Sequence, residues 1–100
     1  MKPALLAPYE VAAALAELPG WTGDTSRIAR SVRLPPDRTA AVLEAVQRAA
    51  DAMDHHPVVD RDGDNVTFSV WTHWVGGVTA ADFTLARAID EVVARAGGDR

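Results

Sequence analysis

The sequence has no cysteine among its 100 residues, and aromatic residues make up only 6% of it. Without cysteine, the protein has no disulfide, no thiolate metal site and no cysteine nucleophile. Basic residues are also few: ten Lys and Arg stand against 14 Asp and Glu, which gives a net charge of -4. Because phosphate-binding surfaces are normally basic, this balance argues against direct binding of nucleic acid. The arginines of the one basic stretch, Arg27, Arg30 and Arg33, are expected to line a solvated strand.

A long hydrophobic run is also missing. The N-terminal stretch is interrupted by Pro3 and Pro8 and carries Glu10 and Glu17, so it falls short of the roughly 18 apolar residues of a membrane span. It also lacks the pattern of a signal peptide. We therefore expect a cytoplasmic protein that does not contact the membrane.

What the chain does contain is the composition of a soluble globular domain. Hydrophobic residues account for 48% of it and charged residues for 24%. A chain of this length can bury one core but not two. We therefore expect a single domain that spans residues 1–100.

Hydrophobic periodicity and turn residues predict seven elements in the order α-β-β-α-β-β-α. Helices are expected at 8–18, 37–53 and 79–96, strands from 21 and over 27–34, 57–60 and 65–73, and a frayed tail at 97–100. Because consecutive strands form hairpins, the sheet should be four-stranded and antiparallel. The predicted fold class is therefore two-layer α+β, with the helices packed on one face of the sheet.

Two adjacent histidines, His55 and His56, stand between Asp54 and Pro57, where the second predicted helix should end. On a helix their side chains would point about 100° apart, so they are poorly placed to chelate one metal ion together. Asp51, four residues before His55, is expected to share its helix face. A helix C-terminus and an adjacent acid both favour protonated imidazole. The pair is therefore placed to exchange protons near neutral pH.

The third histidine, His73, closes the strand predicted at 65–73. Alternation along that strand places Trp71 and His73 on the face opposite the apolar residues that meet the helices. All three histidines lie at junctions between elements, where functional sites tend to occur. Two alternatives remain. One histidine of the pair caps the helix while the other is solvated, or Asp51, His55 and His73 bind a metal ion, although their spacing matches no closed metal site.

An acid, Asp82, lies in the first turn of the last predicted helix. Its spacing from Thr79 is that of a capping box, and an acid in this position can also face a pocket. The preceding Gly76-Gly77 pair is expected to supply a turn only, because the residues of a phosphate-binding loop are missing around it. Trp21 and Trp74 are interpreted as core or interface residues rather than ligand-stacking residues.

These motifs together make the chain resemble the pterin-4a-carbinolamine dehydratases over nearly all of its length. The resemblance lies in "PGW" at 19–21, "DHHP" at 54–57, "TH" at 72–73 and "GGVTAAD" at 76–82. It implies catalytic roles for His55, His56 and His73, substrate-binding roles for Asp51, Asp54 and Asp82, and no metal or cofactor. The chain departs from the family's pattern at Asp51, where glutamate is usual, at Gly63, where an aromatic residue is common, and at the bulky Trp74-Val75 pair.

The resemblance implies a hydro-lyase that converts a 4a-hydroxytetrahydropterin into quinonoid dihydropterin and water, in the recycling of tetrahydrobiopterin. Histidine suits this reaction because each proton transfer needs a group that titrates near ambient pH. We hypothesise that His55 and His73 transfer the protons while His56 orients the ring. The family also implies a homodimer or homotetramer. The alternatives are a non-catalytic dimerisation or assembly-chaperone protein on the same fold, and action on a different pterin.

Overall fold

The computed structural model describes residues 2–96, so the tail predicted at 97–100 lies outside the described residues. The elements are α1 (Pro8–Ala16), β1 (Thr22–Gly23), β2 (Ile28–Arg33), α2 (Thr39–Met53), β3 (Val58–Asp62), β4 (Asn65–Val70), the 3-10 helix η1 (His73–Val75) and α3 (Ala80–Arg95). The predicted order of helices and strands is confirmed. The 3-10 helix was not predicted.

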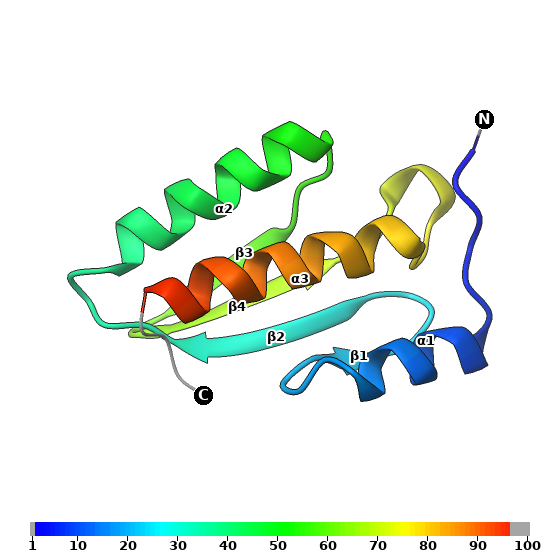
Figure 1. Cartoon of the computed structure of the whole chain (residues 1–100), viewed down its shortest axis with the longest axis horizontal. Helices are drawn as coiled ribbons and strands as arrows, with labels where there is room; N and C mark the ends of the chain where they lie inside the picture. The colour runs from blue at the N-terminus through cyan, green and yellow to red at the C-terminus, as the bar shows by residue number, and fades with distance from the viewer. Residues whose placement is uncertain (1, 97–100) are drawn as a thin grey trace.

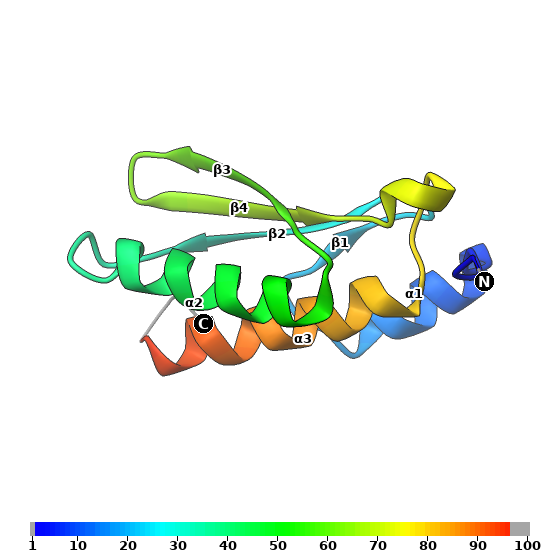
Figure 2. The same ribbon diagram turned by 90° about the horizontal axis from the view of Figure 1, so that it is seen from above.

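The four strands form one antiparallel sheet in the order β1-β2-β4-β3. All three α-helices cover the same face of this sheet, as Figures 1 and 2 show from two directions. The predicted two-layer α+β class is therefore confirmed. The strand β3 forms one edge of the sheet, and each of its five residues is exposed.

The core lies between the sheet and the helices α2 and α3. Alternate residues of β2 and β4 point into it and are at most 1% exposed: Ile28, Val32, Val66, Phe68 and Val70. Burial of one such side chain stabilises the fold by about 1.5–3 kcal/mol. The alternation seen in the sequence therefore fixes which face of the sheet the helices cover.

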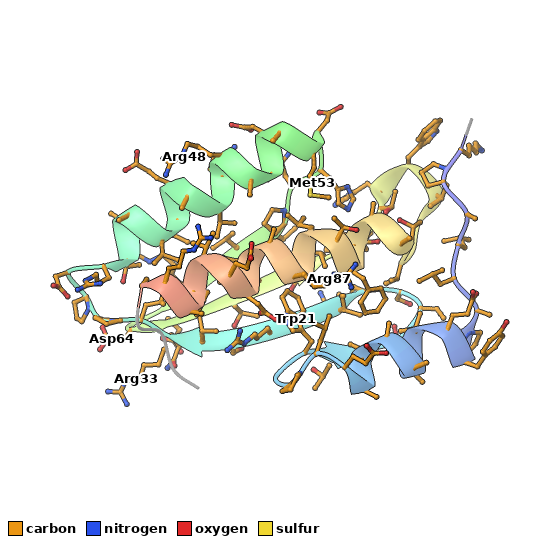
Figure 3. All side chains as sticks on the ribbon, viewed as in Figure 1. Trp21, Arg33, Arg48, Met53, Asp64 and Arg87 are labelled. Carbon is orange, nitrogen blue, oxygen red and sulfur yellow. The ribbon has the colours of Figure 1, made fainter. Side chains whose placement is uncertain are left out.

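Trp21 belongs to this core, as predicted. It is 4% exposed, and its Nε1–H donates to Asp90 Oδ1 of α3 over 2.8 Å. Figure 3 shows it between α1 and α3. The prediction for Arg30 was wrong: this residue lies on the helix-covered face of β2 and forms an ion pair with the same Asp90 oxygen at 2.6 Å. The half-buried Asp90 carboxylate therefore binds the Arg30 guanidinium on the helix side of the sheet.

The helix α2 begins two residues later than the sequence pattern predicted. The Arg38 N–H donates to the Pro35 carbonyl over 2.9 Å, which closes a turn before the helix starts at Thr39. Among residues 2–96, none of the helices has the length and apolar character of a membrane span.

The largest difference from the sequence prediction concerns β4, which ends at Val70 and not at His73. Beyond it, Thr72 pairs only with Gly77 in an isolated bridge. Gly76 adopts a φ of +71°, and a Cβ on Gly77 would lie 2.8 Å from both Leu5 Cδ2 and the Thr25 carbonyl oxygen. The predicted turn role of the two glycines is therefore confirmed, and close packing against Thr25 gives Gly77 a second role.

Candidate active site

The end of α2 determines where the adjacent histidines point. Asp54 takes the left-handed conformation, with φ 51° and ψ 43°, and its N–H caps the carbonyls of Ala50 and Asp51. The His55 N–H also bonds to the Ala50 carbonyl, over 3.0 Å. Aspartate tolerates this conformation better than most residues. Backbone N–H groups thus cap the Ala50 and Asp51 carbonyls, and both imidazoles bond to carboxylates instead of helix carbonyls.

The reversal at Asp54 also changes the expected pairing of acids and histidines. Because His55 lies beyond the helix, it does not share a face with Asp51, and that prediction was wrong. Asp51 instead accepts a hydrogen bond from His56 Nε2 over 2.8 Å. Gln47 Nε2 donates to the same carboxylate oxygen over 3.0 Å. The bond from His56 is the main reason why the pKa of the Asp51 carboxyl lies below its ordinary value.

His55 pairs with Asp82 at the start of α3. His55 Nε2 and Asp82 Oδ1 are 2.5 Å apart, and the Asp82 side chain is fully buried. The other oxygen, Oδ2, accepts the Thr72 hydroxyl at 2.9 Å and the Thr79 N–H at 2.8 Å. The bond from the Thr79 N–H is the contact that the capping-box spacing predicted. Asp82 therefore caps α3 and holds His55 at once.

The two threonines determine which groups donate and which accept in this hydrogen-bond network. Thr72 Oγ1 lies 2.7 Å from Thr79 Oγ1. A hydroxyl has one proton, and the Thr72 proton lies on the bond to Asp82, so we assign the Thr79 hydroxyl as the donor to Thr72. Asp82 then accepts every bond that it makes, including one from His55 Nε2–H. The remaining ring nitrogen of His55, Nδ1, is left for a ligand.

His73 is held in a different way. It opens the 3-10 helix η1 and is exposed, and its ring stacks on Trp71 with centroids 4.2 Å apart and planes inclined by 28°. The two rings share a side, as strand alternation predicted. The expected side of the sheet was wrong, because the strand stops before Trp71 and His73 turns toward the ends of α2 and α3.

The three histidines line one hollow of about 520 Å³. This volume is within the usual range for sites that bind small molecules. The residues that line it are Pro3, Met53, Asp54, His55, His56, Thr72, His73, Trp74 and Ala81. Figure 3 shows Met53 at the end of α2, on the side turned toward α3. The hollow thus combines the end of α2, the loop around η1, the start of α3 and the N-terminal segment.

The predicted site acids divide into two groups. Asp54 lines the hollow directly, whereas Asp51 and Asp82 contact it through His56 and His55. Sequence reasoning missed Thr72, which lines the hollow and bonds to Asp82. The available signal was the "TH" dipeptide itself, because a threonine before a site histidine can reach a buried acid.

Two residues that depart from the family's pattern, Trp74 and Gly63, lie in different parts of the structure. Trp74 is 62% exposed and lines the hollow. Gly63 lies in the turn between β3 and β4, at the end of the sheet away from η1 (Figure 2). Figure 3 labels its neighbour Asp64 at that same end. Within one chain, the residue at position 63 therefore does not shape the rim of the hollow.

The alternative metal site is not assembled in the part of the chain that the structure describes. Within residues 2–96, no group of three or more histidines and acids lies close enough to hold one metal ion. Asp51 and His55, two of the three suggested ligands, bond to His56 and Asp82 respectively.

Comparison with known proteins identifies the family to which the chain belongs. The model of the family described as "Pterin 4 alpha carbinolamine dehydratase" matches residues 4–92. Two proteins named "Putative pterin-4-alpha-carbinolamine dehydratase" are similar along almost their whole length. The one from Mycobacterium sp. (strain KMS) is 43% identical, over 92% of this chain and 99% of that protein. The one from Nocardia farcinica is 40% identical, over 88% of this chain and 94% of that protein.

A solved structure also matches the fold. It is described as a transcriptional coactivator/pterin dehydratase from Brucella melitensis, and it superposes with a TM-score of 0.83 at 26% sequence identity. The superposition covers 89% of this chain and 98% of the Brucella chain. Sequence, fold and the family model therefore agree, and the chain belongs to the pterin-4a-carbinolamine dehydratase family.

Proposed function

We propose that this protein is a hydro-lyase that dehydrates a 4a-hydroxytetrahydropterin, as a step in the recycling of tetrahydrobiopterin. The observation that carries the proposal is the meeting of three imidazoles at one hollow in a member of this family. Groups that titrate near neutral pH are those that general acid–base catalysis requires. The hollow also has room for a bicyclic ring.

The reaction needs two proton transfers and no net transfer of electrons. The C4a–O bond breaks, and the departing hydroxide takes a proton from an imidazolium and leaves as water. N5 of the ring loses its proton to a second, neutral imidazole, and the electron pair of that N–H bond forms the C4a=N5 double bond. The products are quinonoid dihydropterin and water, so the residues of the hollow suffice for the chemistry.

In this proposal His55 and His73 are the proton-transfer pair, and His56 binds and orients the ring. His55 offers Nδ1 to the ligand because its Nε2 is bonded to Asp82. His56 is restrained by its hydrogen bond to the Asp51 carboxylate, and this bond is the main cause of the lowered pKa of Asp51. Asp54, on the wall of the hollow, is placed to accept a hydrogen bond from the substrate.

The test is the rate of dehydration of freshly generated 4a-hydroxytetrahydropterin, compared with the spontaneous rate. His55→Ala and His73→Ala are each expected to lower kcat by about 10²-fold, the lower end of the range for acid–base catalysis. Tyr9→Leu is the control, because Tyr9 is 76% exposed on α1 and lies outside the hollow. Wild-type protein no faster than the spontaneous reaction would refute the proposal, as would two histidine variants as active as wild type.

A non-catalytic role is the second candidate, and the exposed edge of the sheet favours it. Val58 and Val59 of β3 are 40% and 38% exposed, on a strand whose outer edge is unpaired within the described chain. Unpaired edges of this kind can bind another chain. Recovery of a stoichiometric protein partner by inactive wild-type protein would support a dimerisation or assembly role. A panel of pterins in the binding assay tests the further alternative of a different substrate.

The same edge supports the proposal that the protein is a homodimer or homotetramer. Pairing of two β3 edges would satisfy their free backbone groups and cover the exposed valines. Light scattering on purified protein should therefore give a mass of at least two chains. A mass of one chain at micromolar concentration would contradict this proposal without affecting the proposed reaction.

A further inference from the structure

The three histidines of the hollow differ in what restrains their rings. His55 and His56 each have one ring nitrogen bonded to a carboxylate, from Asp82 and Asp51 respectively. His73 is in contact with the indole of Trp71 instead. A carboxylate restrains an imidazole by occupying one of its nitrogens, whereas a stacked ring restrains its plane and leaves both nitrogens open.

The backbone on both sides of Trp71 is fixed. Before it, Val70 pairs with Ile28 in the last register position of β4. After it, the Thr72 N–H donates to the Gly77 carbonyl over 2.9 Å, and the Thr72 side chain bonds to Asp82. The backbone that carries the half-buried Trp71 indole is therefore held in place on both sides.

The backbone of His73 is fixed as well, but its side chain is exposed. The turn of η1 is closed by bonds from the Val75 N–H to the Thr72 carbonyl at 3.2 Å and from the Gly76 N–H to the His73 carbonyl at 3.2 Å. An exposed imidazole on such a turn would sample several rotamers. Contact with the Trp71 ring, at a centroid distance of 4.2 Å, favours one of them.

We propose that Trp71 is a positioning residue that holds the His73 imidazole in the orientation needed for proton transfer. This inference rests on the proposed dehydratase function. An indole face accommodates neutral imidazole and, through the cation–π interaction, imidazolium. The stack thus holds the ring in both protonation states without competing for either nitrogen, which a proton-transfer group needs in each cycle.

The test compares Trp71→Leu, which removes the aromatic face, with Trp71→Phe, which keeps one. Because small misplacements of a catalytic group are costly, Trp71→Leu should lower kcat by about 10- to 100-fold and leave KM within about twofold. Trp71→Phe should recover much of the loss. Tyr9→Leu, which removes an exposed aromatic ring from α1, should have wild-type kcat and KM.

A double variant separates positioning from a general structural effect. If Trp71 acts only through His73, then Trp71→Leu combined with His73→Ala should be no slower than His73→Ala alone. NMR provides a readout independent of activity. The His73 ring protons, assigned by their loss in His73→Ala, should be shifted by the indole ring current in wild type, and that shift should disappear in Trp71→Leu.

Each result decides a different claim. A wild-type enzyme that dehydrates its substrate, with losses from Trp71→Leu and His73→Ala that multiply, overturns the positioning role alone. So does a His73 resonance that is the same in wild type and Trp71→Leu. A wild-type protein that has the ring-current shift but no dehydratase activity overturns the proposed function, and with it the catalytic purpose of the stack.

Discussion

Two regions beside the hollow restrain their histidines with different kinds of contact. On the α3 side, one ring nitrogen of His55 bonds to the fully buried Asp82 carboxylate, whose other oxygen accepts the Thr72 hydroxyl and the Thr79 N–H. On the η1 side, an exposed imidazole rests on an aromatic face. The first arrangement contributes to stability because its polar groups are buried and must be satisfied. The stacking of His73 on Trp71 contributes little to the free energy of unfolding. Its main effect is to orient the His73 ring.

This comparison predicts its largest effect at Asp82. Asp82→Ala removes the acceptor for the Thr72 hydroxyl, the Thr79 N–H and His55 Nε2. The Thr72 hydroxyl and the Thr79 N–H are buried, and a buried donor left without a partner costs about 1–3 kcal/mol, so we expect a loss of at least about 2 kcal/mol in the free energy of unfolding. Urea denaturation measures this loss. Trp71→Leu is the contrasting variant and should lose much less; equal losses would remove the distinction between the two regions.

Thr72→Val is expected to have the next largest effect. Valine has nearly the same shape, but it removes one donor to Asp82 and the acceptor of the Thr79 hydroxyl. The free energy of unfolding should fall by about 1–3 kcal/mol, and kcat should fall because Asp82 holds His55 less firmly. Thr72→Ser keeps the hydroxyl and serves as the control. A serine variant as impaired as the valine variant would show that the methyl group, and not the hydroxyl, matters at this position.

A matched pair of glycines tests the η1 side. Gly76 and Gly63 have φ values of +71° and +61°, and a Cβ on either would meet no atom within 4 Å. Alanine at either position should therefore cost about the same, roughly 1 kcal/mol of backbone strain. Only Gly76→Ala should also lower kcat, because Gly76 ends the turn that carries His73. Equal activity of the two variants would show that the η1 backbone does not set the His73 geometry.

The smallest effect is expected at Asp51, where the acid–histidine pair is exposed. The hydrogen bond from His56 lowers the pKa of Asp51, so His56→Ala should raise that pKa toward its ordinary value. A lowered folded-state pKa stabilises the protein above the unfolded-state pKa, and this contribution is lost as pH falls through the folded value. NMR titration of the carboxyl carbons measures the change. Asp24 is the internal control, because its pKa is lowered chiefly by the Ser26 N–H and should not move.

Local patterns in the sequence were sufficient for the fold. The alternation from Val66 to Val70 fixed the buried face, and the spacing of Thr79 and Asp82 identified the start of α3. The resemblance to the family identified the histidines that the structure brings to one hollow. These features depend on residues that are close together in the chain, or on family motifs that are separated by the expected number of residues.

The predictions that failed depend on tertiary contacts. "WTH" continues the strand pattern, but the chain turns at η1, where the Thr72 N–H bonds to the Gly77 carbonyl over 2.9 Å and the Val78 N–H bonds to the Thr25 carbonyl over 2.8 Å. The predicted pairing of Asp51 with His55 does not form, because Asp54 takes a left-handed conformation that no pattern in the sequence indicates. The stacking of His73 on Trp71 was also not predicted, because it follows from the early end of β4.

The reversal at Asp54 has a consequence for how this scaffold tolerates change. The bond of the His55 N–H to the Ala50 carbonyl and the Asp54 dihedrals tie the imidazole pair to the last turn of α2. The first turns of that helix act on the site only through their packing in the core, where Val42 and Val46 are buried. Whole turns inserted or deleted near Thr39 would leave the histidines in register with the last turn. A single residue inserted between Ala50 and His55 would rotate both rings out of the hollow.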